Sequence, residues 1–312
     1  MRAIAVTFFL FCFVFPAALA QLKYGFYSRS CPHAESIVTN VVAKHFRRDR
    51  SIAADLVRMH FHDCFVKGCD ASLLIDPKPG RPSEKNAGPN ASVDGYEIID
   101  EAKKQLEAHC PHTVSCADVV TLATRDAVTL AGGLRYAVPT GRRDSLRSNP
   151  ADVNLPGPTI PVTDAIQAFG AVGLNLFDMV TLVIGGHTIG VIHCSLIQDR
   201  IADPAMERTL NAKLRNQCRA PNDPTVFLDQ RTSFKVDNGL CLEVLRQRGV
   251  LRIDQSLGLD GRTRGIIMSY AKDNALFNRK FAQALVKMGT RRFLSGRAGE
   301  IRKNCRVFNN GH

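Results

Sequence analysis

The sequence predicts a mainly α-helical protein whose long loops are held by disulfides, and three observations predict it. Apolar residues recur at helical spacing in several segments, most clearly in 275–288 and 116–131. Alternating apolar and polar runs, which would indicate strands, are scarce. Nine of the ten cysteines follow an N-terminal stretch like those of secreted proteins, and secreted cysteines usually pair.

Residues 1–20 are predicted to be a signal peptide rather than part of the fold. Arg2 gives a positive start, IAVTFFLFCFVF is a short apolar core, and Ala18-Leu19-Ala20 supplies the small residues that a signal peptidase accepts. This run is too short for a membrane anchor, and no other run is long and apolar enough to span a bilayer. Cleavage after Ala20 would leave residues 21–312 as the mature chain, long enough for one large domain or two lobes.

Eight segments are predicted to be helices, and two of them have a clear apolar face. In 275–288 this face consists of Phe277, Phe281, Ala284, Leu285 and Met288. In 116–131 it consists of Val119, Val120, Ala123, Ala127 and Leu130. The other six segments are 33–47, 52–65, 95–109, 161–172, 176–184 and 262–274. The Pro-rich segments 76–90 and 149–161 are predicted to be ordered loops.

Cysteine content and charge narrow the class of protein. Nine cysteines remain after residue 20, so at least one stays unpaired, and eight partners allow about a hundred pairings that sequence alone does not resolve. The net charge is +12, and a secreted basic protein meets acidic polysaccharide or membrane surfaces before nucleic acid. Because the charges are dispersed, with no basic stripe carrying stacking aromatics, nucleic-acid binding is disfavoured.

The segment 57–76, VRMHFHDCFVKGCDASLLID, concentrates reactive side chains among apolar residues. A zinc site, a disulfide-stapled calcium loop and a catalytic pocket would each use them. On a regular helix His60 and His62 point about 200° apart, so they cannot bind one zinc ion together. Secretion also favours a disulfide over thiolate ligands for Cys64 and Cys69. A zinc site is therefore the least supported of the three interpretations of this segment.

The other two interpretations of this segment stay open on spacing alone. Asp63, Asp70 and Ser72 offer the oxygens that a hard cation takes, but the same groups could simply cap and turn the chain. Arg58 and His62 are four residues apart and share a helix face. The cation would keep the imidazole a neutral base, able to take a proton. Taken alone, however, a buried histidine beside a surface arginine is the plainer interpretation.

A second histidine follows an apolar run in 178–194, DMVTLVIGGHTIGVIHC. Gly185 and Gly186 would allow a flat group to approach the backbone closely. His187 could then be the axial ligand of a haem, although a lone histidine in such a place is more often structural. The sequence has no CxxCH motif, which excludes covalent c-type attachment.

The two motifs together resemble the secretory plant haem peroxidases (the class III family). The likeness covers nearly the whole mature chain, including LKYGFYSRSCPHAESIV, EKNAGPN, TVSCADVVTLATRDAV, VPTGRRDS, the VDN and IDQ of 236–255, and SGRAGEIRKNC. It implies that 21–312 form a haem peroxidase domain, a two-lobed helical fold with haem between a distal and a proximal lobe and four disulfides. The implied pairs are Cys31–Cys110, Cys64–Cys69, Cys116–Cys305 and Cys194–Cys218.

The resemblance also implies roles for individual residues. His187 matches the proximal ligand of the haem iron, and Asp254 matches the acid that accepts its other ring proton. His62 matches the distal base that takes a proton from hydrogen peroxide, and Arg58 matches its partner. Three more residues match family positions, namely Phe61 against the haem edge, Asn90 as support of the His62 ring, and Pro139 near the edge where donors bind.

One non-covalent haem b and two calcium ions are the implied cofactors. The calcium ions would brace the helices that carry the two histidines. The distal ion would be bound by Asp63, Val66 and Gly68 (both by carbonyl oxygens), Asp70, Ser72 and, through water, Glu84. The proximal ion would be bound by Thr188, Asp229, Thr232, Lys235 (by its carbonyl oxygen) and Asp237.

The function implied is a secreted monomeric enzyme. It would reduce hydrogen peroxide to water and oxidise small phenolic donors in one-electron steps, in wall lignification or cross-linking, peroxide removal and stress responses. We expect the cell wall or apoplast rather than the vacuole, because no long extension follows Cys305. The alternative is a redox-inactive, calcium-stabilised wall-binding protein, but such a protein would not need Arg58, His62, His187 and Asp254 together. A zinc hydrolase would need a motif such as HExxH, which the sequence lacks.

The sequence departs from the family pattern at several positions. Cys241 replaces an aromatic residue and is expected to be a buried free thiol, and Tyr136 stands where the family commonly has a tryptophan. The segment 90–95 is one residue short, and Asp94 replaces a common arginine, which puts the support of His62 in question. Asn90 also begins the chain's N-x-S/T sequon, but we expect it to be buried and unmodified.

Overall fold

The computed structural model describes residues 21–309. The predicted signal peptide, residues 1–20, lies outside them. The described chain is mainly helical, as predicted, and its strands are one short antiparallel pair, β1 (Val191–His193) and β2 (Thr225–Phe227), in which Val191 lies opposite Phe227.

All eight predicted helices are present, with ends within three residues of those expected. They are α1 (Ala34–Arg48), α2 (Ile52–Val66), α3 (Tyr96–His109), α4 (Cys116–Leu130), α5 (Val162–Ala171), α6 (Leu176–His187), α11 (Arg264–Lys272) and α12 (Asn274–Arg291). Four more were not predicted: α7 (Gln198–Ile201), α8 (Arg208–Gln217), α9 (Gly239–Leu245) and α10 (Arg252–Leu259). Short 3₁₀ turns are η1 (Ser72–Leu74), η2 (Glu84–Asn86), η3 (Gly88–Asn90), η4 (Pro150–Asp152) and η5 (Cys194–Ile197).

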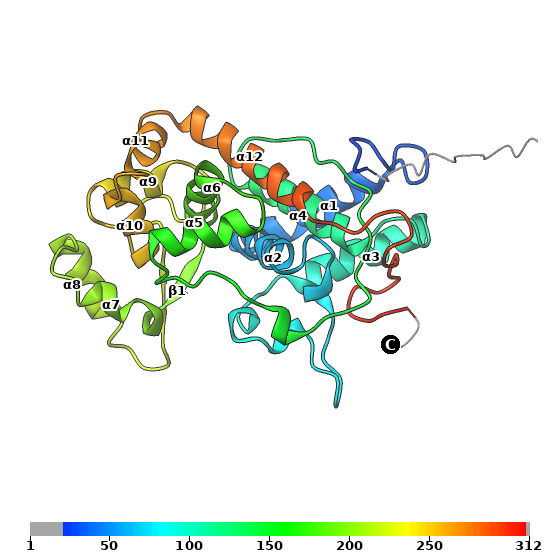
Figure 1. Cartoon of the computed structure of the whole chain (residues 1–312), viewed down its shortest axis with the longest axis horizontal. Helices are drawn as coiled ribbons and strands as arrows, with labels where there is room; N and C mark the ends of the chain where they lie inside the picture. Colours follow the sequence, from blue (N-terminus) through cyan, green and yellow to red (C-terminus); the bar gives the residue numbers. More distant parts are fainter. Residues whose placement is uncertain (1–20, 310–312) are drawn as a thin grey trace, which may run out of the picture.

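The helices form two groups with α12 between them. Figure 1 shows α1 to α4 on one side, α5 to α11 on the other, and α12 crossing from the second group to the first. Helix α12 packs against both α2 and α6, and α2 also contacts α6. The residues of α2 and α6 therefore meet where the two groups join, which is the arrangement that the two-lobed fold requires.

The apolar faces predicted for α12 and α4 explain this packing. All five residues of the α12 face are buried. In α4, four of the five are buried, but Leu130 is 36% exposed, so that part of the prediction was wrong. Leu130 is the last residue of α4, where the chain turns away from the neighbouring helices. A periodic pattern does not reveal where packing ends.

Capping side chains define where two central helices begin. Ser115 Oγ accepts from Asp118 N (3.1 Å) at the start of α4. At the start of α6, Asn175 Oδ1 accepts from Asp178 N (3.0 Å) and Asp178 Oδ2 accepts from Asn175 N (2.7 Å), which is a reciprocal capping box. This cap fixes the residue at which α6 begins, and the helix ends at His187.

The four disulfides pair as the resemblance implied: Cys31–Cys110, Cys64–Cys69, Cys116–Cys305 and Cys194–Cys218. Cys241 is a buried free thiol. The bridge Cys116–Cys305 spans 189 residues and ties the C-terminal segment to the start of α4. Within residues 21–309, no single helix has the length and hydropathy to cross a membrane, although α5 and α6 pass that test as a pair bent by 106°.

Candidate active site and calcium sites

The distal side of the site is built on α2. Arg58 and His62 lie on the same face of this helix, one turn apart, and Arg58 Nε lies 3.3 Å from His62 Nε2. The other ring nitrogen, His62 Nδ1, is 2.7 Å from Asn90 Oδ1. An amide oxygen can only accept a hydrogen bond, so Nδ1 carries the proton and Nε2 keeps its lone pair. The ring is therefore a base at Nε2.

His62 is held neutral by its surroundings. Burial, followed by the nearby Arg58 charge, lowers the pKa of His62 to about 4, although the hydrogen bond with Asn90 acts in the opposite direction. A base with this pKa is unprotonated over the whole neutral and mildly acidic range, so it is ready to accept a proton.

The short segment 90–95 keeps the support of His62 intact. Asn90 is buried and its Nδ2 donates to the carbonyl oxygen of Glu84 (2.8 Å), which orients the amide. Gly95, at φ +84°, makes the tight left-handed turn into α3 that a shorter segment needs. The question raised by the missing residue is thus answered in favour of the hydrogen bond.

This segment also binds Arg58, which the sequence did not reveal. Arg58 Nη2 donates to Pro89 O (3.0 Å) and to Ser92 Oγ (3.1 Å), and its Nη1 donates to the carbonyl oxygen of Ser92. The contacts join residues more than 30 positions apart, so no local sequence pattern predicts them. They fix the guanidinium beside His62.

The other two residues predicted for the distal side behave differently. Phe61 lies beside His62 (ring centroids 6.1 Å apart) and packs on Phe65 and Phe169 at 4.8 and 5.9 Å. Pro139 is buried, and its carbonyl oxygen accepts from Arg142 (2.9 Å). The place of Pro139 near the edge where donors bind stays a prediction.

The proximal side is built on α6 and α10. His187 Nδ1 is 2.8 Å from Asp254 Oδ1, and Asp254 is fully buried. Within residues 21–309, His187 Nε2 has no hydrogen-bond partner, and the side chain is 32% exposed. A carboxylate that accepts from Nδ1 makes Nε2 more electron-rich, which suits it to bind a metal. Neither α10 nor its acid was recognisable from periodicity.

The two glycines before His187 have different roles. A Cβ on Gly185 would lie 2.2 Å from the Phe281 ring, so this glycine allows α12 to pack closely on α6. A Cβ on Gly186 would meet nothing within 4 Å. The space for a flat group is therefore beside Gly186 and the free nitrogen of His187, and the residues present fit an axial haem ligand.

The predicted distal calcium ligands converge after α2. Among residues 21–309, three buried oxygens find no hydrogen-bond partner: Asp63 Oδ1, Ser72 Oγ and Glu84 Oε2. Burial and the neighbouring Asp70 raise the pKa of Asp63 well above its ordinary value, and burial raises the pKa of Glu84 to about 7. Carboxylates crowded in this way need a cation, and this set of oxygens fits calcium.

The chain that supplies the two distal carbonyl oxygens passes close to another segment. Val66 ends α2 and is buried. Gly68 has φ +120°, and a Cβ there would lie 2.6 Å from the carbonyl oxygen of Arg292. Only glycine fits this position, which explains the glycine between the two cysteines of the Cys64–Cys69 bridge.

The predicted proximal ligands also come together. Thr188 Oγ1 lies 2.9 Å from Asp237 O, 3.4 Å from Asp229 Oδ2 and 3.5 Å from Lys235 O. Thr232 Oγ1 lies 3.1 Å from Asp229 Oδ2 and 2.8 Å from Asp237 Oδ1. These oxygens surround one point next to His187, and the donor set again fits calcium.

A glycine borders this proximal cluster. A Cβ on Gly239 would lie 2.3 Å from Thr232 Oγ1 and 2.6 Å from Asp229 Oδ2. Any larger residue would therefore push the ligand oxygens apart. The sequence showed this glycine but not its reason.

The structure does not support a zinc site in the segment 57–76. His60, Cys64 and Cys69 do place ligand atoms within 4.8 Å of one another. However, the two sulfurs are bonded to each other. His60 is buried, its ring nitrogens have no hydrogen-bond partner, and burial lowers its pKa to about 3, so it packs as a neutral ring.

Comparison with known proteins identifies the family. Residues 38–273 match the model of the peroxidase family. The chain is 70% identical to peroxidase 44 of Arabidopsis thaliana over 310 residues, which cover 99% of this chain and 100% of that protein. The chain belongs to the plant secretory haem peroxidases. This peroxidase is also 54% identical to peroxidase 57 of Arabidopsis thaliana (95% and 96% covered) and 46% identical to peroxidase 5 of Vitis vinifera (93% and 92% covered).

Membership decides between the two classes of function. This peroxidase is an enzyme, and the redox-inactive wall-binding protein is not favoured. Haem and calcium are general cofactors of the family, and hydrogen peroxide with a reducing donor is its general substrate pair. The residues predicted to bind these cofactors and peroxide are those of the two histidine sites and the two oxygen clusters described above.

Proposed function

We propose that this peroxidase binds one non-covalent haem b between α2 and α6, with His187 as the iron ligand. It would reduce hydrogen peroxide with electrons from small phenolic donors. One observation carries the proposal: the two histidines have partners of opposite kind. Asn90 offers His62 a neutral oxygen at 2.7 Å, whereas Asp254 offers His187 a carboxylate at 2.8 Å.

The difference between these partners assigns the two roles. A neutral amide leaves His62 an ordinary weak base, whose low pKa keeps it free to take a proton and to release it again. A buried carboxylate strengthens the donation of electrons from His187 Nε2, as a metal ligand requires. Exchanging the partners would suit neither role.

The protein's part in the reaction is proton transfer and charge stabilisation. Bound haem supplies the redox chemistry, the cleavage of the O–O bond and the acceptance of single electrons. His62 Nε2 takes a proton from one oxygen of peroxide and returns it to the other oxygen, the one that leaves. Water therefore leaves rather than hydroxide. Arg58 stabilises the charge that develops meanwhile. In balance, one peroxide and two phenols yield two waters and two phenoxyl radicals.

Two calcium ions are part of the proposal. The distal ion would be bound by Asp63, Asp70, Ser72 and the carbonyl oxygens of Val66 and Gly68, with Glu84 through water. The proximal ion would be bound by the Thr188, Asp229, Thr232, Lys235 and Asp237 oxygens. Asp63 follows His62 and Thr188 follows His187, so each ion would fix one end of a catalytic helix.

We further propose that residues 1–20 direct secretion and that the mature monomer works in the cell wall or apoplast. Proteins of this family are generally secreted, and the charge of +12, which becomes +11 once Arg2 is removed with residues 1–20, suits acidic wall polysaccharide. Phenolic coupling in the wall, peroxide removal and stress responses are uses that fit this place. Pro139 is the proposed residue near the edge where phenolic donors would bind, and the resemblance to the family supports it.

The visible spectrum tests the central claim. Residues 21–312 would be folded with haemin, calcium and a thiol–disulfide buffer, and the Soret band followed before and after one equivalent of peroxide. We expect the band to drop and shift, then to recover when a phenol is added. His62→Leu should keep the band but lose the rapid response, and His187→Ala should lose the native band. A folded, calcium-bound wild-type chain with no Soret band would overturn the proposal.

A further inference from the structure

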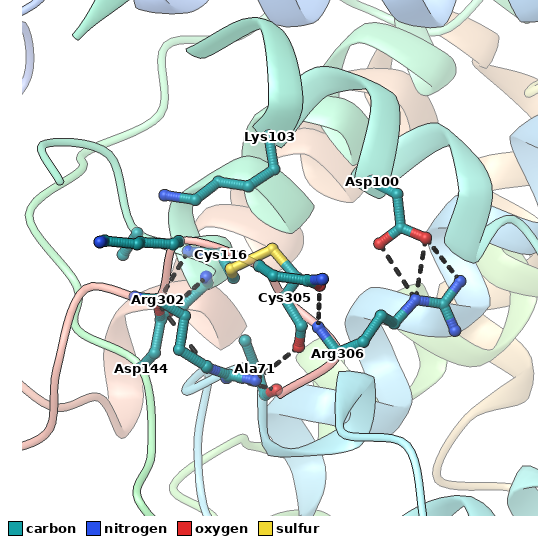
Figure 2. Close-up of a disulfide and its surroundings, with 12 residues drawn as sticks. Ala71, Asp100, Lys103, Cys116, Asp144, Arg302, Cys305 and Arg306 are labelled. Atoms are coloured by element: carbon teal, nitrogen blue, oxygen red, sulfur yellow. Dashed lines mark hydrogen bonds and ion pairs between the residues drawn. A yellow bond between two sulfur atoms is a disulfide. The ribbon is translucent and has the colours of Figure 1, made fainter. Parts of the chain in front are cut away.

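Arg302 is a fully buried cation that reaches the loop of the distal calcium ligands. It belongs to the segment after α12, far along the chain from that loop. Its Nη2 donates to the carbonyl oxygens of Ala71 (2.7 Å) and Asp70 (3.3 Å), and its Nη1 donates to that of Cys305 (2.7 Å). Figure 2 shows the guanidinium between the loop at Ala71 and the disulfide.

The part of the loop that Arg302 holds is strained. Ala71 has φ +58°, in the left-handed region that residues with a Cβ rarely adopt. Such a conformation is unfavourable by itself and persists only where its surroundings hold it in place. Ala71 lies between two predicted ligands, Asp70 and Ser72, so its conformation sets where their oxygens point. Its own N–H donates to a third, Asp63 Oδ2, at 3.0 Å.

Arg302 is itself anchored to the core. Its backbone N–H donates to Asp144 Oδ2 (2.9 Å). The same carboxylate accepts from Cys116 N (3.1 Å) and Ala117 N (3.0 Å) at the start of α4, where the disulfide Cys116–Cys305 is attached. The backbone of Arg302 is thus tied through Asp144 to the start of α4, close to the disulfide, while its guanidinium contacts the loop at Ala71, as Figure 2 shows.

We propose that Arg302 is a positioning residue for the distal calcium ion, because it holds Asp70 and Ala71 in the conformation that presents the Asp70 and Ser72 oxygens. The inference rests on the calcium sites of the proposed function. Arg302 does not touch the ion in this role. Its guanidinium adds a second hydrogen bond to two carbonyl oxygens that also accept from Ser145 N (2.8 Å, at Asp70) and Leu74 N (3.2 Å, at Ala71). Because it ties both to one fixed group, it keeps the loop preorganised for binding.

The test measures calcium at the distal site alone. In haem-loaded chain carrying Asp237→Asn, which weakens the proximal site, Ca²⁺ affinity is measured by chelator competition and atomic emission. Into this background we would place Arg302→Met, Arg302→Lys and two controls. Arg200→Met removes another buried arginine, one that bonds the carbonyl oxygen of Gly249 (3.0 Å). Arg306→Met removes the arginine four residues further on, which pairs with Asp100 (2.8 Å) instead.

We expect Arg302→Met to lower the affinity for the remaining Ca²⁺ ion about tenfold or more, and Arg302→Lys to recover part of this loss. Both controls should bind Ca²⁺ with the affinity of the Asp237→Asn background. Unchanged affinity in Arg302→Met would overturn the inference, and so would an equal loss in Arg200→Met, because the cause would then be general loosening of the core. If neither the wild type nor the background binds calcium, the proposed sites themselves fail, and the inference fails with them. Circular dichroism would confirm that each variant is folded.

Discussion

The hydrogen bond between Asn90 and His62 can be tested with Asn90→Val, which keeps a similar volume and removes both polar atoms. His62 Nδ1–H would lose its acceptor at 2.7 Å, whereas the carbonyl oxygen of Glu84 would lose the Asn90 donor at 2.8 Å but keep Ala87 N at 3.1 Å. Leaving a buried polar group without a partner costs about 1–3 kcal/mol. The free energy of unfolding should fall by about that much.

The same change should slow the reaction with peroxide. The hydrogen bond favours the ring tautomer with its lone pair on Nε2, and a loss of about 1.4 kcal/mol is about a tenfold change in population. We therefore expect the second-order rate constant, measured by stopped-flow Soret absorbance, to fall about tenfold on its plateau, and up to about 100-fold if the ring also turns.

The pH profile makes this prediction specific. The Asn90 bond raises the pKa of His62, which burial lowers to about 4. Since protonated His62 cannot act as the base, the wild-type rate should fall as pH drops through about 4. In Asn90→Val this fall should move to lower pH, and in Asn90→Asp to higher pH, because a carboxylate stabilises the imidazolium.

A control variant separates this effect from damage to the loop. Asn86→Val removes an amide in the same loop that accepts from Ser83 N (2.9 Å) and does not touch His62. It should leave the rate constant and the pH profile unchanged. If Asn90→Val reacts within twofold of wild type at every pH, the bond does not hold the tautomer and the reasoning is refuted.

Four further predictions follow from the same structure. Asp254→Asn should raise the reduction potential of the haem-loaded enzyme, measured by spectroelectrochemistry, because a neutral amide makes His187 Nε2 less electron-rich; an unchanged potential would argue against His187 as the ligand. Calcium affinity should fall as pH drops below about 7, because burial raises the pKa of Glu84 to about 7 and protons then compete with the ion; isothermal titration at pH 8 and 6 checks this, and equal affinities would contradict it. Burial raises the pKa of the Cys241 thiol, so iodoacetamide should modify it only after unfolding; labelling of the native chain would place the thiol at the surface. Peptide mapping of active enzyme should find Asn90 without a glycan, because its side chain is buried between His62 and Glu84, and a glycan there would remove it from this role.

Local periodicity predicted eight of the twelve α-helices that residues 21–309 form, and the two histidine motifs pointed to candidate residues of the site. A periodic apolar face identifies α4 or α12, because each must bury one side along several turns. The helices that periodicity missed, such as α8 and α10, are short and partly polar, and tertiary contacts stabilise them instead. The resemblance to a family, rather than periodicity, identified Asp254 on α10.

What only the tertiary structure decided is which distant residues support those side chains. Ser92 holds Arg58, Arg302 holds the turn at Ala71, and Leu130 is exposed although its spacing predicted burial. A sequence pattern records what each residue can do within a few turns of helix. Contacts between residues 34 or 231 positions apart, such as Arg58 with Ser92 and Arg302 with Ala71, exist only once the whole chain has packed.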